Sequence, residues 1–124
     1  MQLYSEGDFQ AAAQHLDQLP KTPDNNFFLG VCLYLNTEHE RAAEIFTDII
    51  LSSPRWADAA RWYRANIYLR QSNPHQALDS LEQLIQGETE FAEEAKTLSR
   101  KIEEGLRNDS SRQMERDEID TRKP

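Results

Sequence analysis

Apolar residues recur along this chain at spacings of three and four, the period of an α-helix with one buried side. Phe91, Ala95, Leu98 and Ile102, for example, share one side of a single helix. No segment shows the sustained apolar–polar alternation that is typical of a half-buried strand. The pattern therefore predicts an all-α protein. Helices are expected at residues 8–19, 23–36, 38–52, 54–71, 74–86 and 90–106.

The predicted helices form a repeat, because residues 26–51 align with residues 61–86 without a gap at a shift of 35. Small residues meet small ones under this shift, and large apolar residues meet large apolar ones. A partial copy lies upstream at a shift of 30, with its second helix and only the end of its first. Such a repeat predicts a stack of antiparallel helix hairpins, each of which buries its apolar side against its neighbours.

Residues that favour helix ends mark the hairpins. Three helices are expected to begin at a proline that follows a capping residue. These pairs are Thr22-Pro23, Ser53-Pro54 and Asn73-Pro74. Thr37 and Glu40 have the spacing of a capping box, which predicts another helix start at residue 38.

The repeat units resemble the tetratricopeptide repeat, whose pattern is W-x2-L-G-x2-Y, then A-x3-F, then P. The matching positions are Leu29, Gly30, Leu33, Ala42, Phe46 and Pro54 in one unit and Ala65, Tyr68, Ala77 and Leu81 in the next. Asn26 replaces the tryptophan, and Arg64 stands where leucine is usual. The resemblance covers residues 3–102. It implies a right-handed superhelical stack of hairpins that binds another protein or peptide.

The domain organisation follows from the repeat. We expect a helical-repeat domain over residues 1–106, followed by a polar and flexible tail over 107–124. The domain divides into a partial repeat at 1–22, repeats at 23–53 and 54–88, and a capping helix at 89–106. The tail is expected to leave the helix at residues 108–111, where asparagine, aspartate and two serines follow one another.

A narrower resemblance concerns the segment from Trp62 to Leu69 and the closing helix, residues 92–102. These are similar to the C-terminal repeats of envelope-associated proteins from Bacteroidetes-type bacteria. Several of those proteins have a single membrane span before the repeats. The location is therefore left open between the cytoplasm and, if such a span precedes this segment, the cell envelope.

Charge and composition narrow the range of partners. The formal net charge of the 124 residues is −8, and an acidic surface repels the phosphates of nucleic acid. No apolar stretch is long enough to span a bilayer, so no direct membrane contact is expected from this segment. We therefore expect a protein or peptide partner and no nucleic acid.

Catalytic and metal sites are not indicated. The three histidines, His15, His39 and His75, lie in different hairpins and lack the spacing of metal ligands on one helix side. Cys32 lies on an apolar helix with no identifiable base, and the chain has no nucleotide-binding or nucleophile motif. The sequence predicts a protein that is not an enzyme and has no metal, cofactor or catalytic residue.

The resemblance places a partner on the concave side of the stack, lined by the first helix of each hairpin. The candidate residues form an aromatic patch that runs into a small basic end. They are Phe27, Phe28, Val31, Tyr34, Trp62, Tyr63, Asn66, Arg70, Lys96 and Arg100. Aromatic and arginine side chains dominate the binding energy of many interfaces.

Two other interpretations stay open. Aromatic residues at helical spacing are often packed in a core, and the basic residues can form an ordinary solvated helix side. The incomplete first hairpin also leaves Phe9, Leu16 and Leu19 partly uncovered, which favours a partner there. The alternative function is a structural repeat of a larger bacterial protein, with or without a membrane anchor, that self-associates through this hairpin as a homo-oligomer.

Overall fold

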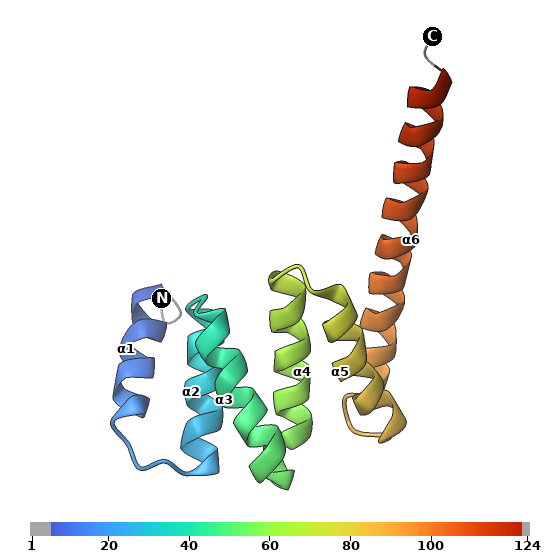
Figure 1. The fold of residues 1–124 in the computed structure, drawn as a ribbon. Helices are drawn as coiled ribbons and strands as arrows, with labels where there is room; N and C mark the ends of the chain where they lie inside the picture. The colour runs from blue at the N-terminus through green and yellow to red at the C-terminus, as the bar shows by residue number, and fades with distance from the viewer. Residues whose placement is uncertain (1–5, 123–124) are drawn as a thin grey trace.

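The computed structural model describes the backbone of residues 6–122 and the side chains of residues 8–108. Its six helices are α1 (Glu6–Asp17), α2 (Pro23–Leu35), α3 (His39–Ser52), α4 (Pro54–Arg70), α5 (Pro74–Gln86) and α6 (Ala92–Arg122). The helices stand side by side from α1 to α6, and each packs against the next in the chain (Figure 1). The described backbone contains no strand. The predicted all-α helical-repeat fold is confirmed.

Two complete hairpins, α2–α3 and α4–α5, form the centre of the stack. Helix α1 packs on α2 in the position of a second helix, and α6 packs on α5 in the position of a first helix at the other end. Helices α2 and α4 also contact each other directly. The first helices of successive units therefore lie on the same side of the molecule.

The hydrophobic core has two parts that meet at α4. The larger part joins α1, α2, α3 and α4 around Leu33, Phe46 and Ile67, which are all fully buried. The smaller part joins α4, α5 and α6, with Leu81 and Leu84 at its centre. Because α4 contributes to both parts, it couples the two hairpins into one packed unit.

The helix starts follow the proline signals, while the capping contacts differ from the prediction. Thr22 caps α2, since its Oγ1 accepts a hydrogen bond from the Asn25 backbone N at 3.1 Å. Neither Ser53 nor Asn73 makes a side-chain capping bond. The capping box predicted at Thr37 is wrong, because the Thr37 hydroxyl donates to the Asn36 carbonyl at 2.6 Å instead.

The turns that end α2, α4 and α5 share one backbone conformation. Thr37, Ser72 and Glu88 have positive φ angles of 63°, 61° and 50°, although none of them is glycine. At the first turn, the Glu38 N–H donates to the Leu33 carbonyl at 2.8 Å, across six residues. This is the Schellman arrangement, in which a left-handed residue lets the chain satisfy the last carbonyls of a helix. The left-handed position, and not a side-chain cap, therefore ends each of these helices.

Replacing Ser72 by glycine is expected to raise the free energy of unfolding by about 0.5–1 kcal/mol, because glycine adopts positive φ without steric cost. Ser72 is exposed and its side chain makes no contact that the change would remove. Urea denaturation would measure the difference. The matched control is Glu104→Gly in the exposed interior of α6, which should lower stability by about the same amount. A loss of stability in Ser72→Gly would contradict this account of the turn.

Helix α6 is longer than the sequence indicated. The predicted helix end at residue 106 and the break at residues 108–111 are wrong, since the helix continues to Arg122 and extends beyond the other helices (Figure 1). Asparagine, aspartate and serine lower helix propensity by less than about 0.7 kcal/mol each, and neither proline nor glycine occurs between Leu106 and Arg122. The side chains of residues 109–124 lie outside the described part. The flexibility predicted for residues 107–124 stays a prediction.

Candidate functional site

The first-helix face, which we define as the side of the stack formed by α2, α4 and α6, contains a hollow between α4 and α6. This hollow has a volume of about 470 Å³. It is lined by Trp62, Asn66, Glu93, Glu94, Thr97, Leu98 and Lys101. Apolar carbon forms its floor and polar groups stand along its rim, a combination that is typical of ligand sites.

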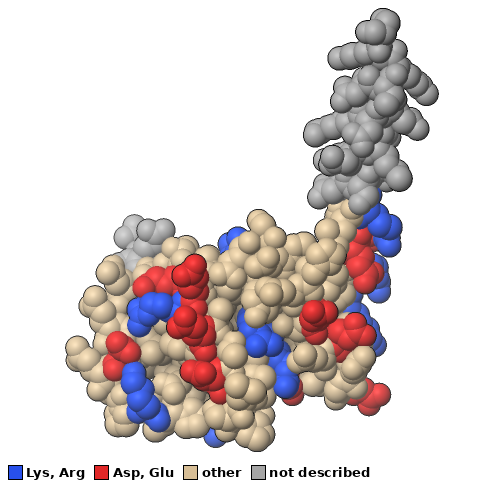
Figure 2. All heavy atoms as spheres, in the orientation of Figure 1, with Lys and Arg blue, Asp and Glu red and all other residues tan. Residues whose placement is uncertain are grey.

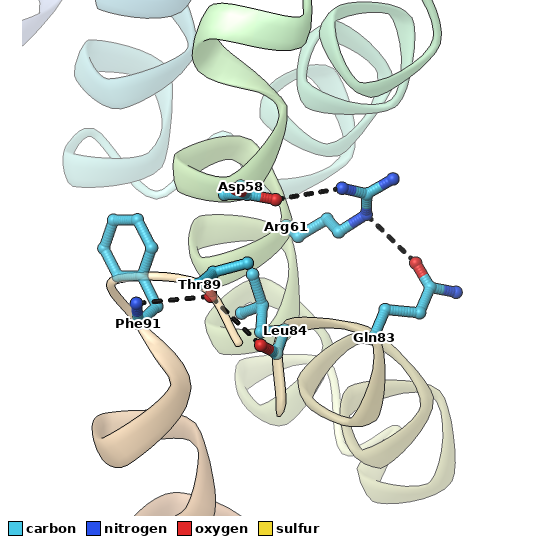
Figure 3. Close-up of polar contacts among 6 residues, drawn as sticks. All are labelled: Asp58, Arg61, Gln83, Leu84, Thr89 and Phe91. Carbon is cyan, nitrogen blue, oxygen red and sulfur yellow. Dashed lines mark hydrogen bonds and ion pairs between the residues drawn. The ribbon is translucent and has the colours of Figure 1, made fainter. Parts of the chain in front are cut away.

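The floor of the hollow is held by an aromatic pair. Trp62 of α4 stacks on Phe91, with ring centroids 6.0 Å apart and planes inclined by 17°. Thr89 positions Phe91: its Oγ1 accepts from the Phe91 N–H at 3.3 Å and donates to the Leu84 carbonyl at 3.0 Å (Figure 3). The turn from α5 to α6 therefore fixes the ring under Trp62.

Arg61 ties α4 to α5 behind this turn. Its Nη1 donates to Asp58 Oδ1 at 3.1 Å, and its Nε donates to Gln83 Oε1 at 3.0 Å (Figure 3). Both contacts are at least partly exposed, so each contributes only modestly to stability. The contact with Gln83 joins α4 to α5, whereas Asp58 lies on α4 with Arg61 and orients its guanidinium.

The basic end of the hollow differs in detail from the prediction. Neither Lys96 nor Arg100 lines it: Lys96 Nζ lies 3.3 Å from Glu93 Oε1 in an exposed ion pair, while Arg100 is exposed. Lys101 lines the hollow instead. The shift of 35 explains this, since it places Lys101 at the position of Asn66.

Most of the predicted aromatic patch is packed between helices. Phe27 is 7% exposed and stacks on Trp56, with centroids 4.3 Å apart. Tyr63 stacks on Phe46 at 5.4 Å and is partly buried against the larger core. Phe27 and Tyr63 are therefore better described as core residues than as the lining of an open groove.

Tyr34 and Arg70 also contact each other across neighbouring units. Arg70 Nε donates to the Tyr34 hydroxyl at 3.2 Å, and its guanidinium lies over the Tyr34 ring at 5.7 Å. The hydrogen bond to Tyr34 raises the pKa of the Arg70 guanidinium, so this group stays charged. Arg70 is exposed and keeps its charge available on the first-helix face.

Helix α2 contributes the exposed apolar part of the face. Phe28 is 50% exposed and Leu35 is 42% exposed, while Val31 between them is partly buried. Phe28 and Leu35 lie seven residues apart and so share one side of α2. Of the predicted aromatics, only Phe28 is exposed by more than a third, whereas Trp62 is partly buried at the hollow.

The sequence prediction overlooked Trp56, whose role appears only in the packing. Its Nε1 donates to Asp24 Oδ1 at 2.6 Å, which joins the start of α4 to the start of α2. A signal was available, because Trp56 and Phe91 are 35 residues apart and stack on Phe27 and Trp62, which are also 35 apart. The stack of Phe91 on Trp62 positions α6 against α4. In this position Thr97, Leu98 and Lys101 line the hollow.

Two features of the described residues bear on metal binding and thiol reactivity. These residues contain no group of three or more histidine, cysteine, aspartate or glutamate side chains able to hold a metal ion. Burial raises the pKa of the Cys32 thiol, which lowers the fraction of reactive thiolate. No helix within the described residues is both long and apolar enough to cross a bilayer.

Charge is unevenly distributed over the surface. Figure 2 shows a band of acidic side chains over the part of the molecule that contains α1 to α3, with basic side chains on either side. Glu40, Glu44 and Asp48 are exposed at four-residue spacing along α3. Because like charges recur along this side, α3 presents an acidic stripe away from the hollow.

Comparison with known proteins identifies one of the two complete hairpins. Residues 59–86, which include most of α4 and all of α5, match the protein-family model described as the tetratricopeptide repeat. The searches of curated proteins and of solved structures returned no match. The narrower resemblance to Bacteroidetes-type envelope proteins stays a prediction.

Proposed function

This chain is an all-α helical-repeat protein that contains a tetratricopeptide repeat, and from this premise we propose that it is an adaptor or scaffold that binds its partner on the first-helix face. Tetratricopeptide repeats are generally modules for protein–protein interaction. The observation that carries the proposal is the hollow between α4 and α6, with its apolar floor and its polar rim. We propose no catalytic role.

The same face offers two kinds of contact. Trp62 and Leu98 supply apolar surface that a partner's side chain can cover, and Asn66 and Lys101 supply polar groups at the rim. Phe28 extends the apolar surface along α2. Burial of apolar surface at about 25 cal/mol per Å² supplies the affinity, and the rim groups supply orientation.

A bulky cation placed in the hollow tests this function. Thr97 is exposed and lines the hollow, so Thr97→Arg should block it and abolish capture of the partner from a lysate of the source organism. Leu51→Arg is the matched control, because Leu51 is 81% exposed on α3 and the change adds the same charge. Circular dichroism would verify that both variants are folded.

The expected result is a protein that both the native chain and Leu51→Arg retain and that Thr97→Arg loses. Equal retention by all three baits would place the partner elsewhere and contradict the proposal. Loss from both variants would mean that added positive charge, and not the hollow, weakens binding. That outcome also counts against the first-helix face.

A second candidate function is self-association through α2, which the exposure of Phe28 favours. At the shift of 35, Phe28 corresponds to Tyr63 and Leu98. Both of these pack against the preceding hairpin and are partly buried, whereas Phe28, on the helix that follows α1, is 50% exposed. A second copy of the chain that covers this strip would bury Phe28 and Leu35 as an inter-repeat contact does.

Light scattering distinguishes this second candidate from partner binding by a monomer. A dimer in the native chain that becomes a monomer in Phe28→Glu would support self-association through α2. A native monomer at every concentration tested would exclude it. The matched control is Leu51→Glu on the opposite helix of the hairpin, which should leave the mass unchanged.

A further inference from the structure

The hollow between α4 and α6 has ends of opposite charge, and we propose that it selects an extended segment of a partner with the pattern basic–x–apolar–x–acidic. This inference rests on the proposed function and adds the chemistry of the bound segment. The acidic end carries Glu93 and Glu94 near the start of α6, and Lys101 stands at the basic end. Leu98 and Trp62 form the apolar centre.

The spacing along α6 defines the ligand. Glu94 and Lys101 are seven residues apart, so they lie on one side of the helix and about 10.5 Å apart along its axis. Leu98 lies between them on the same side. A ligand with three groups in line, a cation, an apolar side chain and an anion, therefore matches these three positions.

An extended chain presents groups at a comparable spacing. Side chains at i, i+2 and i+4 point to the same side and span about 13 Å from first to last. The difference from about 10.5 Å is within the reach of lysine and glutamate side chains on both partners. The volume of about 470 Å³ suits a few side chains, which an extended segment can supply from alternate residues.

The charges at the two ends are available to a ligand. Glu93 is engaged by Lys96 at 3.3 Å, but neither Glu94 nor Lys101 has a hydrogen bond or ion pair among the described residues. Both are exposed, so each contributes a modest, salt-dependent attraction. A segment with two like charges would be attracted at one end of the hollow and repelled at the other.

Nuclear magnetic resonance with three short peptides tests the inference. The probes are capped heptapeptides with serine at both ends, around lysine-serine-leucine-serine-glutamate, around the doubly acidic analogue or around the doubly basic analogue. The readout is the indole N–H signal of Trp62 on the hollow floor. Trp56 is the internal control, because its indole donates to Asp24 away from the hollow. A Trp56→Phe variant assigns the two signals.

We expect the mixed-charge peptide to shift the Trp62 signal with a Kd about threefold to tenfold lower than either like-charged peptide. In Glu94→Lys the charge of the remaining Glu93 is balanced by Lys96, so both ends carry an unpaired cation and the preference should change to the doubly acidic peptide. Glu103→Lys changes the net charge equally at an exposed position that does not line the hollow, and it should keep the native preference.

Two results would overturn the inference, and each leaves a different conclusion. Equal affinity for the three peptides would show a hollow that binds extended chains without reading their charge, and the proposed function would survive. No shift of Trp62 with any peptide, combined with a captured partner that Thr97→Arg loses, would mean that the partner presents a helix or a folded surface. If Thr97→Arg loses no partner either, both proposals fail.

Discussion

Phe46→Ala is expected to lower the free energy of unfolding by about 3–5 kcal/mol, the usual cost of removing a large buried aromatic side chain. Phe46 is fully buried in the larger core. Its ring stacks on Tyr63 of the next hairpin at 5.4 Å and meets Phe27 edge to face at 6.0 Å. The substitution therefore leaves a cavity at the contact between the two hairpins as well as within one of them.

Urea denaturation followed by circular dichroism measures this loss. Because domains of this size are stable by about 5–15 kcal/mol, the variant should have a much lower midpoint or be partly unfolded in buffer. Leu51→Ala is the control, since a side chain that is 81% exposed should change stability by less than about 0.5 kcal/mol. Equal effects of the two substitutions would contradict the placement of Phe46 at the centre of the core.

Gly30→Leu is expected to lower the free energy of unfolding by about 1–3 kcal/mol through overpacking of the seam between α2 and α3. A Cβ atom at Gly30 would lie 2.8 and 2.9 Å from two ring atoms of Phe46 and 3.3 Å from Ile45 Cγ2. Contacts below 3.0 Å require the Phe46 ring to move, and that ring is packed on all sides. The close approach of the two helices therefore needs a residue without a side chain.

The chain contains a matched control for this prediction in Gly105 of α6. A Cβ atom at Gly105 meets nothing within 4 Å, so Gly105→Ala should stabilise the helix by about 0.5–1 kcal/mol. Gly30→Ala should have the opposite sign, because the clash outweighs the gain in helix propensity. A stabilising Gly30→Ala would show that the seam is looser than the structure indicates.

The effects of Gly30→Ala and Phe46→Leu on stability are expected to be coupled. Phe46→Leu removes the ring atoms that Gly30→Ala would meet, so the double variant should be more stable than the sum of the single changes predicts. Additive effects in such a double-mutant cycle would mean that the glycine serves another purpose. The cycle therefore tests the register of α2 on α3 independently of the absolute losses.

The sequence by itself determined the repeat and the residues that build its seams. Residues 26–51 and 61–86 match over two helices each, and Gly30 aligns with Ala65 where the helices approach. The prolines at 23, 54 and 74 each begin a helix as predicted. These features are local or periodic: helix starts depend on neighbouring residues, and the apolar period states which side of a helix is buried.

The tertiary structure decided which members of the aromatic patch are packed and which are available. Phe27 and Phe28 are adjacent and similar in sequence, yet one is 7% exposed and the other 50%. The difference arises because Trp56, at the start of the next unit, covers Phe27 by stacking. A contact between residues 29 positions apart follows from how one hairpin sits on the next, which the helical period does not specify.

The same reason explains why Lys96 and Arg100 do not line the hollow between α4 and α6. The side chains of α6 that face α4 depend on the rotation of α6 about its axis, which is set by the packing of Phe91 on Trp62. That contact turns Lys101 towards the hollow. The turns after α2, α4 and α5 likewise place Thr37, Ser72 and Glu88 at positive φ. None of these residues is glycine, so the sequence does not indicate this conformation. Periodicity therefore determined the helices and their buried sides, whereas contacts between hairpins decided the orientation of each helix and with it the residues that line the hollow.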